Sequence, residues 1–339
     1  MFTTTGAGAE KIKKAGIAIA NPVQGDEIKM TNHHWLFSIK SVQKEFGLST
    51  LLVVNDFNAL AMALPFLNQQ QKYQLGTGHA QENVVIGLVG AGTGLDVSGL
   101  IRANDSWTAL DSEGGHTSFA PRSTRETAIL KYALQIYDHV SSERLLSGAG
   151  LQLIYRALAT DQNIPSEDID APEIMARGLA NACPLCRAVL DTFCEVLGTV
   201  AGNLALTLGA KGGVYIGGGI VPRLGEYFNH SGFRERFEQR GRFTDYLRQV
   251  PTFVITEPFP AFTGISVILA QNAWRQSITW SDCDSQYRLV VTQFCASEKV
   301  TSFLLSGPRL MNATRDNEAR FPNKILAEFP DQRRCKAVT

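Results

Sequence analysis

The chain has 339 residues, of which 44% are hydrophobic and 19% charged, and its formal net charge at pH 7 is zero. This length is enough for two domains with separate cores, and the zero net charge argues against an electrostatic partnership with nucleic acid or an acidic membrane. The apolar runs are short and no charged-then-apolar leader opens the sequence, which predicts a cytoplasmic protein with no membrane span.

The first predicted elements are two strands and a helix. Residues 16–20 form a short apolar run that ends before an Asn-Pro pair, and residues 27–30 predict a second strand. Ser38 is a suitable N-cap for a helix that reaches about Phe46. The amino-terminal stretch is therefore expected to alternate between strand and helix.

The next strand, over residues 51–54, is followed by the polar side chains of Asn55 and Asp56. Ligand sites of α/β sheets lie at the carboxyl ends of strands. A carboxylate there can accept a hydroxyl proton, and an amide suits the hydroxyl groups of a polyol. The same position is also typical of an N-cap, because a helix is predicted over residues 59–67.

A glycine-rich turn joins two further predicted strands, over residues 84–89 and 95–101. Glycines permit positive φ and let backbone N–H groups approach phosphate oxygens. The turn matches neither a Walker loop nor a dinucleotide fingerprint, and on its own it is typical of a hairpin. Asp96 follows closely and would repel phosphate if it faced the site. The turn is Gly90-Ala91-Gly92-Thr93-Gly94.

The segment Glu113-Gly114-Gly115-His116 carries the most specific pattern. It offers an acceptor and a switchable donor to adjacent hydroxyl groups, and its glycines allow close backbone approach. Glu143, in a short helix that begins at Ser142, adds a second carboxylate. A zinc site is the alternative, but further ligands are lacking at local spacing, so no metal site is expected.

The second half predicts a helix that begins at the N-cap Asp170 and long helical structure up to Leu208, with Gly209 near its end. Cys183-Pro184-Leu185-Cys186 lies in this helical stretch, and Cys194 follows on a similar face. Such a pair suggests a metal or redox site, but packed, reduced thiols are the expectation.

Residues 214–216 predict a strand that runs into a glycine turn typical of a tight strand-to-loop transition. Residues 233–243 are rich in Arg and Glu and predict a solvated helix face. A strand over 253–255 and a helix over 264–274 follow, whereas residues 275–339 show no motif. The glycine turn consists of Gly217, Gly218 and Gly219.

Over about residues 15–274, these clusters together resemble the bacterial-type glucokinases of the actin-like sugar-kinase superfamily. The resemblance implies an α/β fold of the two-domain actin-like ATPase (ribonuclease-H-like) type with a central cleft. The expected divisions are a small domain over 1–66, a large domain over 67–256, a helix over 257–274 that returns to the small domain, and an atypical tail over 275–339.

The resemblance also implies a reaction: ATP and D-glucose give ADP and glucose 6-phosphate, with Mg²⁺ carried by the nucleotide and a homodimer as the usual assembly. Asp56 is then the catalytic base. Two alternatives are a non-catalytic sugar-binding pseudokinase and a kinase for another hexose. The implied sugar ligands are Asn55, Asp56, Glu113, His116 and Glu143, and the implied ATP ligands are Gly90, Ala91, Gly92, Thr93, Gly94, Gly217, Gly218 and Gly219.

The sequence departs from the family pattern at its start. Members open with a strand and an Asp-x-Gly-Gly-Thr phosphate loop, and no such loop occurs here. Two expectations follow: the strand that contains Ile17–Ile19 lacks a partner and exposes a sheet edge, and turnover is strongly reduced or absent.

Overall fold

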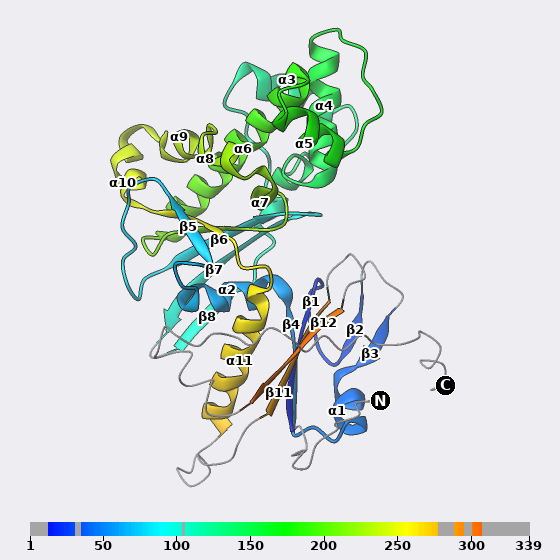
Figure 1. Ribbon diagram of the computed structural model, residues 1–339, viewed down its shortest axis with the longest axis vertical. Coiled ribbons are helices and arrows are strands. Elements are labelled where there is room, and N and C mark those ends of the chain that lie inside the picture. The colour runs from blue at the N-terminus through cyan, green and yellow to red at the C-terminus, as the bar shows by residue number, and fades with distance from the viewer. Residues whose placement is uncertain (1–12, 31–34, 104–105, 277–287, 295–299, 307–339) are drawn as a thin grey trace. The chain divides into compact units, whose positions relative to one another are not determined.

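The computed structural model describes residues 13–30, 35–103, 106–276, 288–294 and 300–306, and the chain divides into two compact units (Figure 1). Unit 1 combines Met1–Phe66 with Phe259–Thr339, and unit 2 is the continuous stretch Leu67–Pro258. Each unit is built around its own sheet.

The main sheet of unit 1 has the strand order β12-β11-β1-β4. The strand β1 is parallel to both β4 and β11, and β12 is antiparallel to β11. The bounds are β1 (Lys14–Ile19), β4 (Thr50–Asn55), β11 (Arg288–Phe294) and β12 (Val300–Ser306).

The predicted exposed edge at Ile17–Ile19 is therefore wrong. Each residue of β1 pairs with a residue of β11, from Lys14 opposite Leu289 to Ile19 opposite Phe294. Two strands from the region without a recognisable motif thus cover the side of β1 that β4 leaves open.

Two helices of unit 1 pack closely against each other, α2 (Asp56–Ala63) and α11 (Pro260–Gln276). Gly264 permits this approach, because a Cβ there would lie 1.6 Å from the carbonyl oxygen of Ala59. A short 3-10 turn, η1 (Leu64–Phe66), follows α2.

The remainder of unit 1 is a hairpin and a short helix. The strands β2 (Glu27–Lys29) and β3 (Leu36–Ser38) pair antiparallel, and α1 (Ile39–Glu45) follows directly. The Ser38 side chain accepts a hydrogen bond from the backbone N–H of Ser41 at 3.1 Å, which confirms the predicted N-cap.

Unit 2 contains a mixed sheet of order β5-β10-β9-β6-β7-β8. Its three consecutive strands β10, β9 and β6 are parallel, and β5, β7 and β8 pair antiparallel to their neighbours. The bounds are β5 (Lys72–Leu75), β6 (Ile86–Ala91), β7 (Leu95–Ala103), β8 (Ser106–Leu110), β9 (Val214–Gly217) and β10 (Thr252–Ile255).

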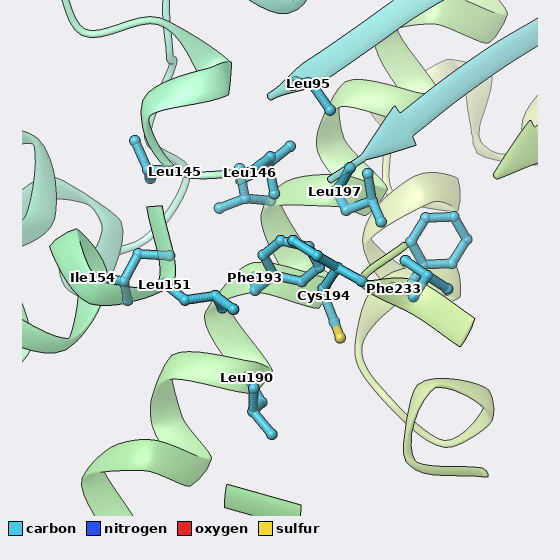
Figure 2. Packing of buried hydrophobic residues seen from close by; sticks show 14 of the residues in the cluster. Leu95, Leu145, Leu146, Leu151, Ile154, Leu190, Phe193, Cys194, Leu197 and Phe233 are labelled. Atoms are coloured by element: carbon cyan, nitrogen blue, oxygen red, sulfur yellow. The ribbon is translucent and has the colours of Figure 1, made fainter. Parts of the chain in front are cut away.

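The helices of unit 2 surround α6 (Pro184–Leu208), whose side chains Leu190, Phe193 and Leu197 meet those of α4 and of the segment at Phe233 (Figure 2). The helix ends at Gly209, which adopts the left-handed conformation with φ +64°. The other bounds are α3 (Thr124–Ala133), α4 (Gly148–Asp161), α5 (Ala171–Leu179), α7 (Val221–Leu224), α8 (Glu226–Asn229), α9 (Phe233–Glu238), α10 (Thr244–Gln249), η2 (Gly114–His116), η3 (Ser142–Arg144) and η4 (Gly241–Phe243).

Helix α6 is also the one helix, within the described ranges, that is long and apolar enough to cross a membrane. Of its most apolar 18-residue window, 67% is buried inside the protein, as expected for the central helix of a core.

The Arg- and Glu-rich stretch after residue 232 is not the solvated face that its composition predicts. Phe233 and Phe237 are fully buried. Arg236 is 8% exposed, contacts Glu126 of α3 through its guanidinium, and donates to Glu195 of α6 at 3.0 Å. Some of the charged side chains of this stretch are therefore paired in a buried ion-pair cluster.

Candidate active site

Asn55 and Asp56 lie in unit 1 at the carboxyl end of β4, where α2 begins. Asn55 is the N-cap of α2, and its Oδ1 accepts hydrogen bonds from the N–H groups of Phe57 and Asn58, both at 3.0 Å. The N-cap of α2 is therefore Asn55 and not Asp56, for which this role was considered. Asn55 has its amide N–H groups to offer a sugar oxygen.

Asp56 is the first residue of α2 and is half-buried. Desolvation raises the pKa of its carboxyl group, against the opposing effect of the backbone N–H groups of Phe57 and of Asp56 itself. A carboxylate with a raised pKa is a better proton acceptor than a fully solvated one. Its environment thus suits a general base.

In unit 2, the two glycine-rich segments lie next to each other. The parallel pairing of β6 with β9 sets Gly90 opposite Gly217, so both strands run into their loops at the same edge of the sheet. The N–H of Ile220 donates to the carbonyl of Ala91 at 3.2 Å. Gly218 has φ +82°, and a Cβ there would lie 2.3 Å from the same carbonyl oxygen.

The turn between β6 and β7 is closed by backbone hydrogen bonds. Gly92 donates to the carbonyl of Gly94 at 2.8 Å, and Gly148 at the start of α4 donates to the carbonyl of Gly92 at 3.0 Å. Thr93 at its tip is exposed, and a Cβ at Gly219 would meet nothing within 4 Å. The two loops therefore present open backbone of the kind that phosphate groups approach.

Glu143 is attached to this turn. Its Oε2 accepts a hydrogen bond from the N–H of Leu95 at 3.1 Å. A Cβ at Gly94 would lie 2.6 Å from that same oxygen, so the glycine leaves the room that the carboxylate occupies. One residue predicted for sugar and one predicted for phosphate are thus in direct contact.

Glu113 and His116 complete this group. Gly115 brings η2 against β7, because a Cβ there would lie only 1.8 Å from the carbonyl oxygen of Leu95. The His116 ring lies between two carboxylates, with Nδ1 3.8 Å from Glu143 Oε1 and Nε2 3.8 Å from Glu113 Oε2. The side chains of Glu113 and His116 are 75% and 59% exposed, so their polar atoms are accessible to a ligand.

The structure thus gathers all the unit 2 candidates at one place, whereas Asn55 and Asp56 share the helix start in unit 1. Sequence reasoning missed the backbone groups of Leu95 and Gly148, for which no side-chain signal exists. Asp96 pairs with Gly90 across the hairpin and is exposed. Within the described part of the chain, no three potential metal ligands cluster.

Two α/β units, with candidate residues at the carboxyl ends of β4, β6 and β9, fit the actin-like class of α/β proteins. A family model described as Glucokinase matches residues 1–272. The chain belongs to the glucokinase family, and the fold class expected from sequence is confirmed.

Curated relatives agree with this assignment. "Bifunctional protein glk" of Paraburkholderia xenovorans is 55% identical over 262 residues, which are 77% of this chain and 41% of that protein. The chain thus spans about two fifths of the length of such bifunctional relatives. A glucokinase of Chromobacterium violaceum is 50% identical over 265 residues, which are 78% of this chain and 76% of its own.

Solved structures show the same fold. A glucokinase from an Antarctic psychrotroph superimposes with a TM-score of 0.71 at 36% identity, covering 76% of this chain and 80% of the other. A Balamuthia mandrillaris glucokinase in complex with glucose reaches 0.64 at 20% identity, covering 76% of this chain and 77% of the other, and supports the fold alone.

Proposed function

We propose that this chain catalyses phosphoryl transfer from ATP to D-glucose, giving ADP and glucose 6-phosphate. The observation that carries the proposal is the contact network of unit 2, in which Glu143 joins the glycine turn through Leu95 and Gly94 and also approaches His116. Membership in the glucokinase family supports the same reaction.

In this reaction the 6-hydroxyl oxygen of glucose forms a bond to the γ-phosphorus, and the bond from that phosphorus to the departing ADP oxygen breaks. Asp56 accepts the hydroxyl proton, for which its raised pKa is suited. Glu113, His116 and Glu143 accept and donate hydrogen bonds to the sugar hydroxyls. Asn55 adds its amide N–H groups.

The nucleotide is assigned to the two adjacent glycine loops. The turn that contains Gly92, Thr93 and Gly94 faces the phosphates, and Gly217–Gly219 lie beside the adenosine. Mg²⁺ carried by the nucleotide would supply positive charge that offsets the negative charge developing during transfer. The burial of α6 supports a water-soluble setting, and we propose the cytoplasm as location and a homodimer as assembly.

The proposal is tested with an assay that couples ADP release to a dye, using the full chain with glucose, ATP and Mg²⁺. The variant Asp56→Asn is expected to lower kcat by roughly 10²–10⁴-fold, the usual contribution of general base catalysis. Glucose should still raise the melting temperature of this variant, because its ligands in unit 2 are untouched. Glucose stabilisation without turnover in the unmodified chain would instead establish a sugar-binding protein that is not a kinase.

The pH dependence gives a second readout. Because burial raises the pKa of Asp56, the acid limb of kcat/KM should have its midpoint above the ~3.9 of a free aspartate. The raised pKa also means that ionised Asp56 opposes folding, and this cost appears as the pH rises through the folded-state value. Asp56→Asn should therefore raise the melting temperature at pH 7 while it removes activity, and a fall in both would contradict the assignment.

A further inference from the structure

Two cysteines lie at the amino-terminal end of α6, and the proposed kinase reaction uses neither. The sequence predicts both as packed thiols within a helix, but the structure places Cys183 at the N-cap with extended backbone and Cys186 in the first turn. Cys183 is half-buried and Cys186 is buried. One cysteine at the start of the helix is therefore partly accessible and the other is enclosed.

The sulfur of Cys183 lies against the backbone of Cys186. The backbone N–H of Cys186 donates to Cys183 Sγ at 3.4 Å. With the two cysteines three positions apart at the start of one helix, side-chain rotation can bring their sulfurs toward the ~2 Å separation of a disulfide. Geometry thus favours an intramolecular bond.

The surroundings favour thiolate at one sulfur. Burial alone would raise the pKa of Cys183, but the N–H groups of Cys186 and Leu185, the Cys186 thiol and the charge of Arg177 outweigh it and lower that pKa. The amino-terminal end of a 25-residue helix acts in the same direction.

The buried thiol has the opposite tendency. Burial, and then the neighbouring Cys183, raise the pKa of Cys186, and the carboxylate of Glu167 adds to this. Arg177, which faces the pair from the end of α5, is itself held by Glu167 at 2.8 Å and Glu173 at 2.6 Å. The Tyr155 hydroxyl of α4 and Arg187, whose backbone N–H donates to the Cys183 carbonyl at 3.0 Å, are further titratable neighbours. Cys183 therefore ionises first.

We propose that Cys183 and Cys186 form a redox-active dithiol that exchanges with small-molecule disulfides, with Cys183 as the nucleophile and Cys186 as the resolving thiol. The Cys183 thiolate attacks one sulfur of the disulfide, forms a mixed disulfide and releases one thiolate. The Cys186 sulfur then attacks Cys183 Sγ, loses its proton and releases the second thiolate. The protein pair is oxidised by two electrons and the disulfide is reduced to two thiols.

Cys194 provides an internal control. It lies eight residues beyond Cys186 in α6, about 12 Å along the helix axis, and is enclosed by apolar side chains (Figure 2). Burial raises its pKa to about 12, so it carries almost no thiolate at neutral pH. Its position excludes a bond to either member of the pair.

The test uses the full reduced chain, equilibrated with mixtures of glutathione and glutathione disulfide, then quenched in acid, alkylated and digested with trypsin. Cleavage after Arg177 and Arg187 yields residues 178–187 as one peptide with both cysteines, and Cys194 lies in the next peptide, 188–211. In oxidising mixtures, peptide 178–187 should be unalkylated and lighter by two hydrogens, while Cys194 remains fully alkylated once denatured. A doubly alkylated 178–187 peptide at every ratio would overturn the proposal.

Conservative variants assign the roles. Cys186→Ser should retain glutathione on Cys183 as a trapped mixed disulfide, Cys183→Ser should gain at least tenfold less adduct at Cys186, and Cys194→Ser should behave as the unmodified chain. Alkylation of Cys186→Ser should reach half its maximal rate at a pH below that of free glutathione. Equal adducts in both single variants, or an alkylation midpoint above that of glutathione, would contradict the assigned nucleophile.

Discussion

The two units of this protein differ in how far apart in the sequence their interacting segments lie. Unit 2 is one continuous stretch, and the loops of its candidate site follow adjacent strands in direct register. Unit 1 is assembled from both ends of the chain, and its β1 pairs with β11, about 270 positions away and beyond the matched residues 1–272. Local register therefore organises the unit 2 loops, whereas a distant segment completes the sheet of unit 1.

The largest loss of stability is expected when the distant segment that contains β11 and β12 is removed. A chain that ends after Gln276 lacks β11 and β12, and β1 loses a ladder of six residue pairs. At about 1 kcal/mol for each hydrogen bond, unit 1 should lose on the order of 5 kcal/mol of unfolding free energy. Calorimetry should show a lower transition for unit 1 and an unchanged one for unit 2.

The matched control ends the chain after Ser306, the last residue of β12, and keeps both strands. It should melt as the full chain does. If both truncated chains melt alike, the pairing of β1 with β11 contributes nothing to unit 1, and the contrast between the units fails.

The next effect tests the buried ion pairs of unit 2. Arg236→Ala leaves Glu126, which is fully buried, without its cationic partner, and the expected loss is about 3–5 kcal/mol by urea denaturation. Arg242→Ala, at an exposed position in the same stretch, should change stability by less than about 0.5 kcal/mol. Similar losses of stability in both variants would mean that Arg236 contributes no more than an exposed charge, as the solvated helix face predicted from composition implies.

A smaller effect is expected in the glycine loops. Gly218→Ala combines positive φ with a Cβ 2.3 Å from the Ala91 carbonyl, and should cost about 2–3 kcal/mol and raise the KM for ATP. Gly219→Ala meets no atom within 4 Å and is the matched control for stability. A KM for ATP that responds to neither variant would argue against this loop as part of the nucleotide site.

The smallest effect concerns Glu143. Glu143→Ala removes the acceptor for the N–H of Leu95, and a buried donor left unpaired costs about 1–3 kcal/mol. Glu143→Gln keeps an oxygen for this bond, so it should retain most of the stability, while both variants raise the KM for glucose. Equal stabilities in the two variants would mean that Glu143 does not support the turn.

Local sequence signals were sufficient to predict much of this fold. The caps at Ser38 and Asp170 and the helix end at Gly209 are confirmed, because each depends on a side chain and backbone within a few residues. Membership in the glucokinase family was also recognised from short motifs. Polar residues after apolar strands marked Asn55, although its capping role required the hydrogen bonds to be seen.

Features that depend on residues far apart in the chain could not be predicted from the sequence. The pairing of β11 with β1 depends on contact between the two ends of the chain, for which no local pattern exists. Composition failed after residue 232, because it counts the charge of Arg236 without showing that Glu126 neutralises it in the interior. Cys183 was expected inside a helical stretch, whereas the structure places it at the N-cap of α6, where its sulfur accepts the backbone N–H of Cys186.

The pairing of β1 with β11 also determines the order in which the two units can fold during synthesis. A ribosome that has completed residue 258 has delivered every strand of the unit 2 sheet, which can then fold while translation continues. The sheet of unit 1 must wait until Phe294 has emerged before β1 gains its second neighbour. Through that interval β1, among the earliest strands made, is available to other chains, so nascent copies of this protein should depend on chaperones most during this part of their synthesis.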